Sequence, residues 1–308
     1  MNGTSEAGLF RQIGILFQRD TELLLNDKKR MCITLILPVV IGMVISFVAD
    51  ADTGKLYEST RAALFTIICA GIYVGMFNSL PLICKERHII KREYMTGMRI
   101  SSYIIAMTLF QAIISLVQTL LFMAIYWNSL DLSKMLDLSG MGKVIITGSL
   151  FVDYTISLFM VMFASDMIGL LISALVRTNE LANLIAPIII IFQLVMSGVL
   201  FELSGVMEKV AGVTVSKWGM QAMGSLAGLD GMRTAARDTF GSKGDDAYQA
   251  FQALSKSKRN DINNPDGMDA YTATSDNLLQ AWMVMGAIIL LLAILCVVFL
   301  RRVEKDAR

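Results

Sequence analysis

The sequence predicts an all-α membrane protein with six transmembrane helices. Of its 308 residues, 55% are hydrophobic and 17% are charged, and the mean hydropathy is +0.60, whereas soluble domains carry about 25% charged residues. A helix needs about 20 mostly apolar residues to cross a bilayer. Runs of this kind, uncharged or nearly so, occur at residues 31–48, 62–84, 100–127, 144–176, 181–201 and 278–300.

The segment before the first span, residues 8–27, has the pattern of an amphipathic helix. Its apolar residues recur at helical spacing, and the polar residues off that face are Arg11, Gln12, Arg19, Asp20 and Glu22. The segment is too polar to span, so residues 1–30 are expected to form a cytoplasmic helical segment along the membrane interface. No short apolar core with a cleavage site follows residues 1–7, so no removable signal peptide is expected.

Basic residues near the span ends predict the orientation, because cytoplasmic loops are enriched in Lys and Arg. With both termini inside, fifteen basic residues lie on the cytoplasmic side, and four lie in the two short outer loops. Trp127, Trp218 and Trp282 then fall near the outer interface, where tryptophan is enriched. We therefore expect a multi-pass protein of the plasma (inner) membrane with cytoplasmic N- and C-termini.

The largest polar region, residues 202–277, lies on the outer side in this topology. Residues 203–229 are mostly apolar or small and predict short helices that re-enter the outer leaflet or cap the bundle. A further helix is predicted at residues 245–255, with Asp245 as its N-cap. The last span, residues 278–300, leads into a cytoplasmic tail at 301–308.

A densely charged stretch, residues 84–103, joins the second and third spans. Ile89, Ile90, Tyr94 and Met98 mark one apolar stripe, and charged residues cover the rest. This pattern is typical of a short helix at the membrane surface or against a soluble partner. An ordinary cytoplasmic loop with a positive charge is the alternative.

The pattern of this stretch resembles the coupling-helix segment of ABC exporters of the G subfamily, which have the type-2 (ABC-2-like) permease architecture. The positions that match are Glu86, Arg87, Arg92, Glu93, Gly97, Ser102 and Tyr103. Gln12, Arg19 and residues 26–27 look like the elbow helix of the same family. The resemblance extends over nearly the whole chain, from the elbow helix to the last span, and implies a coupling helix at residues 85–99.

The resemblance implies that the chain is the membrane domain of an ATP-driven exporter that moves a hydrophobic or amphiphilic cargo by alternating access. Its partners would be an ABC ATPase domain, a second copy or a homologous permease, and membrane lipid. The residues that the resemblance assigns to ATPase coupling are Glu86, Arg87, Lys91, Arg92, Glu93, Gln12 and Arg19. The family's extracellular disulfides and glycosylation sites are missing, which fits a bacterial relative.

The sequence gives this chain no nucleotide site of the P-loop kind, Gly-x4-Gly-Lys-Ser/Thr. Its two Gly-Lys pairs, at residues 54–55 and 142–143, are followed by Leu56 and Val144. We therefore expect no catalytic residue and no cofactor bound by this chain, with ATP and Mg on the partner ATPase. His88 is the single histidine, so metal ligation and Ser-His-Asp chemistry are not expected. A net charge of +1 argues against nucleic acid as a partner.

Two acidic residues, Asp153 and Asp166, lie within the fourth span. A carboxylate in lipid is costly unless it is hydrated or paired, so each is a candidate functional residue. Asp153 lies near the outer end, where solvation is the simple expectation. Asp166 is deeper and is expected to face the bundle interior, with a structural partner favoured over proton coupling.

Candidate residues of a substrate path come from the second and fifth spans. Gly71 and Gly75 allow close helix packing, and Tyr73 and Phe77 lie on a nearby face that could line a cavity. Residues 196–201 resemble the family's plug between the inner cavity and the outside, which would make Val199 and Leu200 a valve. A plain helix end with a glycine is the alternative for this segment.

Two other functions remain open from the sequence. One is a lipid- or glycan-exporting ABC permease, for which an outer region shorter than 202–277 would be more natural. The other is a membrane scaffold or channel without an ATPase partner, in which the charged inner loop only anchors the fold. Charge reversal at Glu86 or Arg92 would leave the activity of such a scaffold intact.

Overall fold

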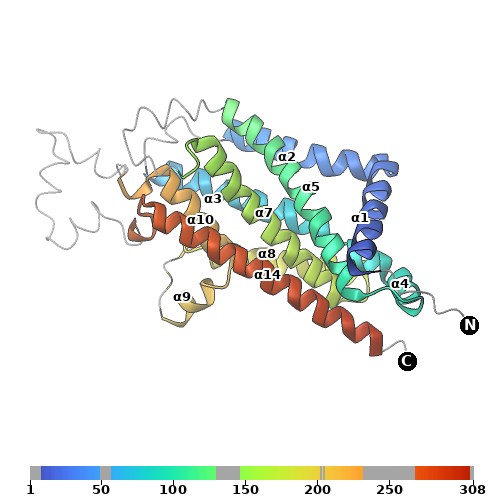
Figure 1. Cartoon of the computed structure of the whole chain (residues 1–308). Helices are drawn as coiled ribbons and strands as arrows, with labels where there is room; N and C mark the ends of the chain where they lie inside the picture. Colours follow the sequence, from blue (N-terminus) through green and yellow to red (C-terminus); the bar gives the residue numbers. More distant parts are fainter. Residues whose placement is uncertain are drawn as a thin grey trace, which may run out of the picture.

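The computed structural model describes residues 8–48, 57–129, 146–201, 203, 205–231 and 268–305, and in these ranges its regular elements are all helices. Long helices lie side by side as a bundle, and α1 and α4 lie at one end of it (Figure 1). The α-helices are α1 (Leu9–Asn26), α2 (Lys28–Val48), α3 (Tyr57–Ser79), α4 (Leu82–Met95), α5 (Ile100–Ser129), α7 (Leu150–Leu175), α8 (Asn179–Val195), α9 (Val206–Ala211), α10 (Val215–Ala227) and α14 (Ser275–Lys305).

Five helical stretches in the described ranges are long and apolar enough to cross a membrane. They correspond to α2, α3 with its continuation α4, α5, α7 and α14. The predicted fifth span, residues 181–201, is shorter in the structure, because α8 ends at Val195 after 17 residues. Met196 is its C-cap, and Gly198, with φ of +76°, then turns the chain away from the helix direction. A helix of this length reaches only about 26 Å at ~1.5 Å per residue. Membrane crossing by residues 181–201, and with it the total of six spans, therefore stays a prediction.

The central helix of the bundle is α7, which packs against α3, α5, α8, α10 and α14. It lies closest to α3, where glycines replace side chains on both helices. A Cβ atom on Gly75 would collide with the backbone carbonyl of Met162, and one on Gly169 would lie 2.6 Å from the carbonyl oxygen of Met76. The predicted packing role of Gly71 and Gly75 fits this contact, since Leu158 lies 3.1 Å from a Cβ built on Gly71.

The second span ends earlier than predicted. The sequence predicted an apolar span that continues to residue 84, followed by a coupling helix at 85–99. In the structure α3 ends at Ser79, and α4 runs over Leu82–Met95. Pro81 lacks a backbone N–H and stands at the start of α4, which is a favoured position for proline. A turn with Gly97 at φ +102° then leads into α5. Leu82, Ile83 and Cys84 therefore belong to α4, where they are buried.

The predicted amphipathic segment 8–27 matches α1, which lies across the bundle end at a steep angle to α2 (Figure 1). Leu16, Asp20 and Leu24 form its buried stripe, and α1 packs along α5, with Phe17 edge-on to Phe110 at 6.3 Å between ring centroids. The end of α14 lies at the same end of the bundle as α1 and α4.

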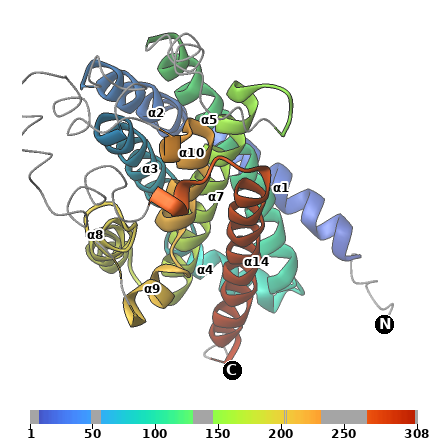
Figure 2. The ribbon, with the colours of Figure 1, turned by 90° about the vertical axis from the view of Figure 1, so that its left-hand side faces the viewer.

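Short helices α9 and α10 occupy the predicted re-entrant region at 203–229. Figure 2 shows α10 close to α3 and α7, and α9 below α8. Trp218 on α10 donates its indole N–H to the carbonyl of Gly212 at 2.7 Å, which ties the two short helices together. The predicted helix at 245–255 lies outside the described residues.

The α3–α7 contact gives a first prediction. Gly75→Ala and Gly169→Ala each place a methyl group against rigid backbone, and overpacking of this kind costs about 1–3 kcal/mol. Both variants should melt at lower temperature than the wild type when purified in detergent. Gly286→Ala in α14 is the control, because its Cβ meets nothing within 4 Å. Equal melting of Gly75→Ala and Gly286→Ala would contradict the close contact.

Candidate functional site

A densely connected polar site lies where α1, α4 and the start of α5 meet. One guanidinium nitrogen of Arg19 lies 2.8 Å from a carboxylate oxygen of Glu86, and the other lies 3.1 Å from Glu93. Arg19 also bonds its neighbour Asp20 at 3.0 Å. The Tyr103 hydroxyl donates to Glu86 at 3.2 Å, and the Arg19 guanidinium lies 5.8 Å from the Tyr103 ring centroid. We call Arg19, Asp20, Glu86, Glu93 and Tyr103 the Arg19 cluster.

Helical spacing explains why one arginine serves two glutamates. Glu86 and Glu93 are seven residues apart on α4, which places them on one face, two turns apart. The planar guanidinium of Arg19 carries donors on several nitrogens and can bond both carboxylates at once. Its side chain is 25% exposed, and those of Glu86 and Glu93 are 19% and 31% exposed. The cluster is thus half-buried and less screened than a surface pair.

The charges of the cluster are not balanced, because one arginine faces three carboxylates. Burial opposes the charge of Arg19, but the carboxylates, Glu86 foremost, outweigh it and raise the pKa of the guanidinium. Burial raises the pKa of the Asp20 carboxyl, and Arg19 partly offsets this. Among the described residues, the second oxygen of Asp20 has no hydrogen-bond partner. Asp20 is also the most buried of the three carboxylates of the cluster.

Gln12 contacts the same interface two turns nearer the N-terminus of α1. Its side-chain amide donates to the carbonyl of Gly97 at 3.4 Å and accepts the backbone N–H of Arg99 at 3.2 Å. Gln12 lies two turns from Arg19 on the same face of α1. It thus connects α1 to the turn between α4 and α5.

The opposite side of α4 is tied to the end of α7. The Arg87 guanidinium donates to the carbonyl of Val176 at 2.7 Å, just past the end of α7. The Cys84 backbone N–H donates to the Ser173 hydroxyl at 3.0 Å. Together with the Arg19 cluster, these bonds hold α4 between α1 and the central helix.

One face of α4 remains open. Five residues at helical spacing are exposed on it, namely Lys85, His88, Ile89, Arg92 and Met95. The predicted apolar stripe is therefore divided, because Ile90 is 1% exposed while Ile89 is 41% exposed. This open face, which we call the α4 outer face, carries three basic or titratable side chains around an apolar centre.

The comparison with protein families decides the class of the protein. The model of the family described as "ABC-2 type transporter" matches residues 11–223, which include most of α1, all of α4 and every member of the Arg19 cluster. The chain belongs to the ABC-2 type transporter family. ABC-2 membrane domains are permease components that work with ATP-binding domains, so this permease is a multi-pass membrane protein.

A relative supports the same class. An "ABC transporter ATP-binding/permease protein" of Mycobacterium tuberculosis is 24% identical to the permease over 243 residues. The match covers 73% of this chain and 26% of that protein. The chain thus spans about a quarter of the length of the relative it matches.

The residues that the sequence assigned to ATPase coupling fall into three groups in the permease. In the first group, Arg19 bonds Glu86 and Glu93, Gln12 bonds the turn between α4 and α5, and Arg87 bonds the carbonyl of Val176 just past α7. Arg92 lies on the α4 outer face. Lys91 is half-buried beside it. The expectation that Asp20 lies off the packed face of its helix was wrong, because it is 6% exposed.

The proposed substrate-path residues lie far apart along the bundle. Tyr73 and Phe77 lie together on α3, with ring centroids 4.5 Å apart, and Tyr73 is 42% exposed. Val199 and Leu200 follow the turn after α8, and Leu200 is 53% exposed. Arg61 on α3 donates to the carbonyl of Gly198 at 2.8 Å and so fixes this turn against α3.

Both acidic residues of the fourth span are fully buried. Asp153 is not solvated, as its place near the span end suggested, because its carboxylate accepts the backbone N–H groups of Ile146 at 2.9 Å and Thr147 at 3.3 Å. Asp166 accepts side-chain amides of Gln111 at 3.1 Å and Asn78 at 3.5 Å, and the hydroxyl of Ser115. Each carboxylate thus has several donors.

Removal of the central cation should weaken the site. Arg19→Met leaves Glu86 and Glu93 without their partner, and we expect a loss of about 1–3 kcal/mol, less than for a fully buried pair because the cluster is partly hydrated. Arg19→Lys keeps the charge but not the planar guanidinium that bonds two carboxylates at once, so its loss of stability should be intermediate. Thermal melting measures both, and Arg11→Met, exposed on the same helix, is the control. If Arg19→Met and Arg11→Met melt alike, the cluster contributes nothing.

Asp166 provides a separate test of the buried network. Asp166→Leu removes the acceptor of two amide donors, at about 1–3 kcal/mol for each unmatched group, and should reduce the monodisperse fraction in size-exclusion chromatography. Asp166→Asn keeps an oxygen acceptor for Gln111 and should be milder. A leucine variant that is as monodisperse as the wild type would show that the network is dispensable.

Proposed function

We propose that the chain is the membrane domain of an ATP-driven exporter, and that the α4 outer face receives the ATPase domain. The observation that carries this proposal is the placement of α4. Its inner side is bonded to both α1 and α7, while Lys85, His88, Ile89 and Arg92 face outward at the bundle end. A helix held in this way transmits displacement to the bundle rather than absorbing it.

The cytoplasmic orientation is supported by where the basic residues gather. In the structure α1, α4 and the end of α14 share one end of the bundle (Figure 1), and these elements, together with the start of α2 directly after α1, carry most of the arginines and lysines near the spans. Cytoplasmic ends of membrane proteins are enriched in such residues. This end therefore faces the cytoplasm in our proposal. We count α8 as a crossing in addition to the five longer ones, and six crossings place both termini on the cytoplasmic side.

The proposed transport cycle needs partners beyond this chain. ATP and Mg bind the partner ATPase, and two permeases form a dimer around the path of a hydrophobic or amphiphilic cargo. Tyr73 and Phe77 would line the path, and Val199 and Leu200 would close its outer end. ATP can drive the cycle only if it binds one arrangement of the complex better than the other. In this cycle α1 and α4 transmit closure of the ATPases to the spans.

A charge reversal on the α4 outer face tests the proposal. The permease is reconstituted in proteoliposomes with the ATP-binding domain encoded beside or fused to it, and ATP hydrolysis is measured. Arg92→Glu should lower hydrolysis about 10-fold or more, as expected when one partner of an interface charge pair is reversed. Its fold should be intact, because Arg92 is exposed. Arg301→Glu, an equal charge change on exposed α14, should have little effect.

Two results would overturn the proposal in different ways. If the complex with Arg92→Glu hydrolyses ATP at the wild-type rate, the ATPase domain does not bind the α4 outer face. A permease with which no ATP-binding domain associates would instead favour a membrane scaffold or channel. A complex that hydrolyses ATP faster with added lipid-linked glycan than with an amphiphilic drug would favour the lipid- or glycan-exporting alternative.

A further inference from the structure

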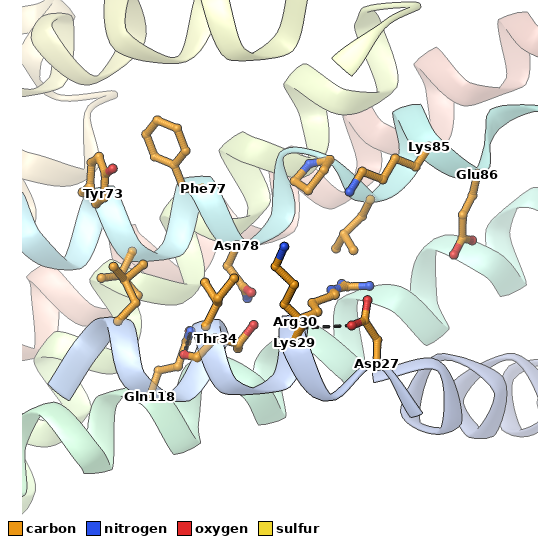
Figure 3. A pocket seen from close by; sticks show the side chains of 15 residues that line it. Asp27, Lys29, Arg30, Thr34, Tyr73, Phe77, Asn78, Lys85, Glu86 and Gln118 are labelled. Carbon is orange, nitrogen blue, oxygen red and sulfur yellow. Dashed lines mark hydrogen bonds between the residues drawn. The ribbon is translucent and has the colours of Figure 1, made fainter. Parts of the chain in front are cut away.

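A cavity of about 540 Å³ lies between α2 and the α3–α4 junction, with Gln118 of α5 behind it (Figure 3). This volume is within the range of small-molecule sites, about 300–1,000 Å³. The cavity is charged at one end and apolar at the other. Its lining residues are Asp27, Lys29, Arg30, Ile33, Thr34, Leu37, Tyr73, Val74, Phe77, Asn78, Pro81, Leu82, Lys85, Glu86 and Gln118. We call it the basic groove.

The charged end of the groove offers cations that the protein itself does not neutralise. Figure 3 shows Lys29 pointing from α2 toward the α3–α4 junction, with Lys85 across the opening. Within the described part of the chain, neither ammonium group makes an ion pair. The groove has three cations, Lys29, Arg30 and Lys85, and two carboxylates, of which Asp27 accepts the backbone N–H of Arg30 at 3.1 Å and Glu86 bonds Arg19. An acidic ligand group would therefore meet unpaired positive charge.

The other end of the groove is apolar and open toward the side of the bundle. Ile33 is 56% exposed, as expected for a side chain that faces lipid in a membrane protein. From Lys29 to Leu37 the groove follows α2 for about 12 Å at ~1.5 Å per residue. That length suits the first part of an acyl chain that runs parallel to the helix.

A polar side chain stands between the two ends. Gln118 is 1% exposed and donates to the carbonyl of Thr34 at 2.9 Å. Its own carbonyl oxygen is buried and has no partner among the described residues. This oxygen can accept a hydrogen bond from a hydroxyl group of a ligand in the groove. Acidic end, polar middle and apolar end follow the order of groups in a phospholipid.

We propose that the basic groove binds an acidic phospholipid from the surrounding leaflet, with its phosphate between Lys29 and Lys85 and one acyl chain along Ile33 and Leu37. Basic pockets between membrane helices commonly hold such headgroups. The groove also touches Glu86 and Asn78, which belong to the Arg19 cluster and to the Asp166 network. A bound lipid would thus brace α2 against the α3–α4 junction.

The test uses the full chain in nanodiscs, either of phosphatidylcholine alone or with added phosphatidylglycerol, and needs no ATPase. Phosphatidylglycerol should raise the melting temperature of the wild type, because a ligand that binds the folded state stabilises it. This increase should disappear in Lys29→Gln/Lys85→Gln. Phosphatidylglycerol that co-purifies with this variant in detergent should fall about 10-fold, as measured by mass spectrometry.

Two further variants separate the groove from general surface charge. Ile33→Trp fills the apolar end without a change of charge and should also abolish the increase. Arg92→Gln removes an exposed cation on the same basic end and should keep it. An increase that persists in the double lysine variant or in Ile33→Trp would overturn the proposal. So would an equal increase from inorganic phosphate in phosphatidylcholine discs, since a free anion would then be the ligand.

Discussion

Arg19 is the cation on which the arrangement of α1, α4 and α5 depends. It is shared by Glu86 and Glu93 on α4 and lies beside the Tyr103 ring on α5. Charged groups leave water at a cost, and the cluster recovers that cost only if its geometry is kept. A small shift of α4 along α1 would therefore break several bonds together. The interface has few intermediate arrangements, which suits an element that must pass on a movement.

The rest of the bundle is rigid for a different reason. The contact of α3 with α7 relies on glycines that bring backbone to backbone, and Ser79 donates to the carbonyl of Asp166 at 2.7 Å across it. Close packing of this kind resists sliding, because membrane helices associate largely through van der Waals contact and interhelical hydrogen bonds. Since α4 follows α3 after a short link and is bonded to α7, a movement of the Arg19 cluster is passed on to the packed core.

Hydropathy predicted most of the helices but not all of their ends. The apolar run continues past Ser79 to Cys84, so a pattern of hydrophobic residues does not register the turn at Pro81. The end of α8 was missed in the same way, because residues 196–201 are mostly apolar although the helix ends at Val195 and the chain turns at Gly198. Helix ends are set by local backbone geometry, and average hydrophobicity carries no information about that geometry.

The site was predicted in part. Resemblance pointed to Gln12, Arg19, Glu86 and Glu93, but not to the fact that Arg19 bonds both glutamates and that Gln12 bonds the turn between α4 and α5. Asp20 was misplaced, because an amphipathic pattern assumes a single apolar partner, whereas α1 also has a polar one in α4. Ser173 and Val176 gave no signal, since their groups matter only through the fold that brings them to Cys84 and Arg87.

The link between α3 and α4 is short and consists only of Leu80 and Pro81. It makes α4 a lever of about 21 Å at ~1.5 Å per residue. A tilt of roughly 10° about Pro81 would carry its far tip about 4 Å, so a small rotation at the membrane surface becomes a displacement the size of a side chain.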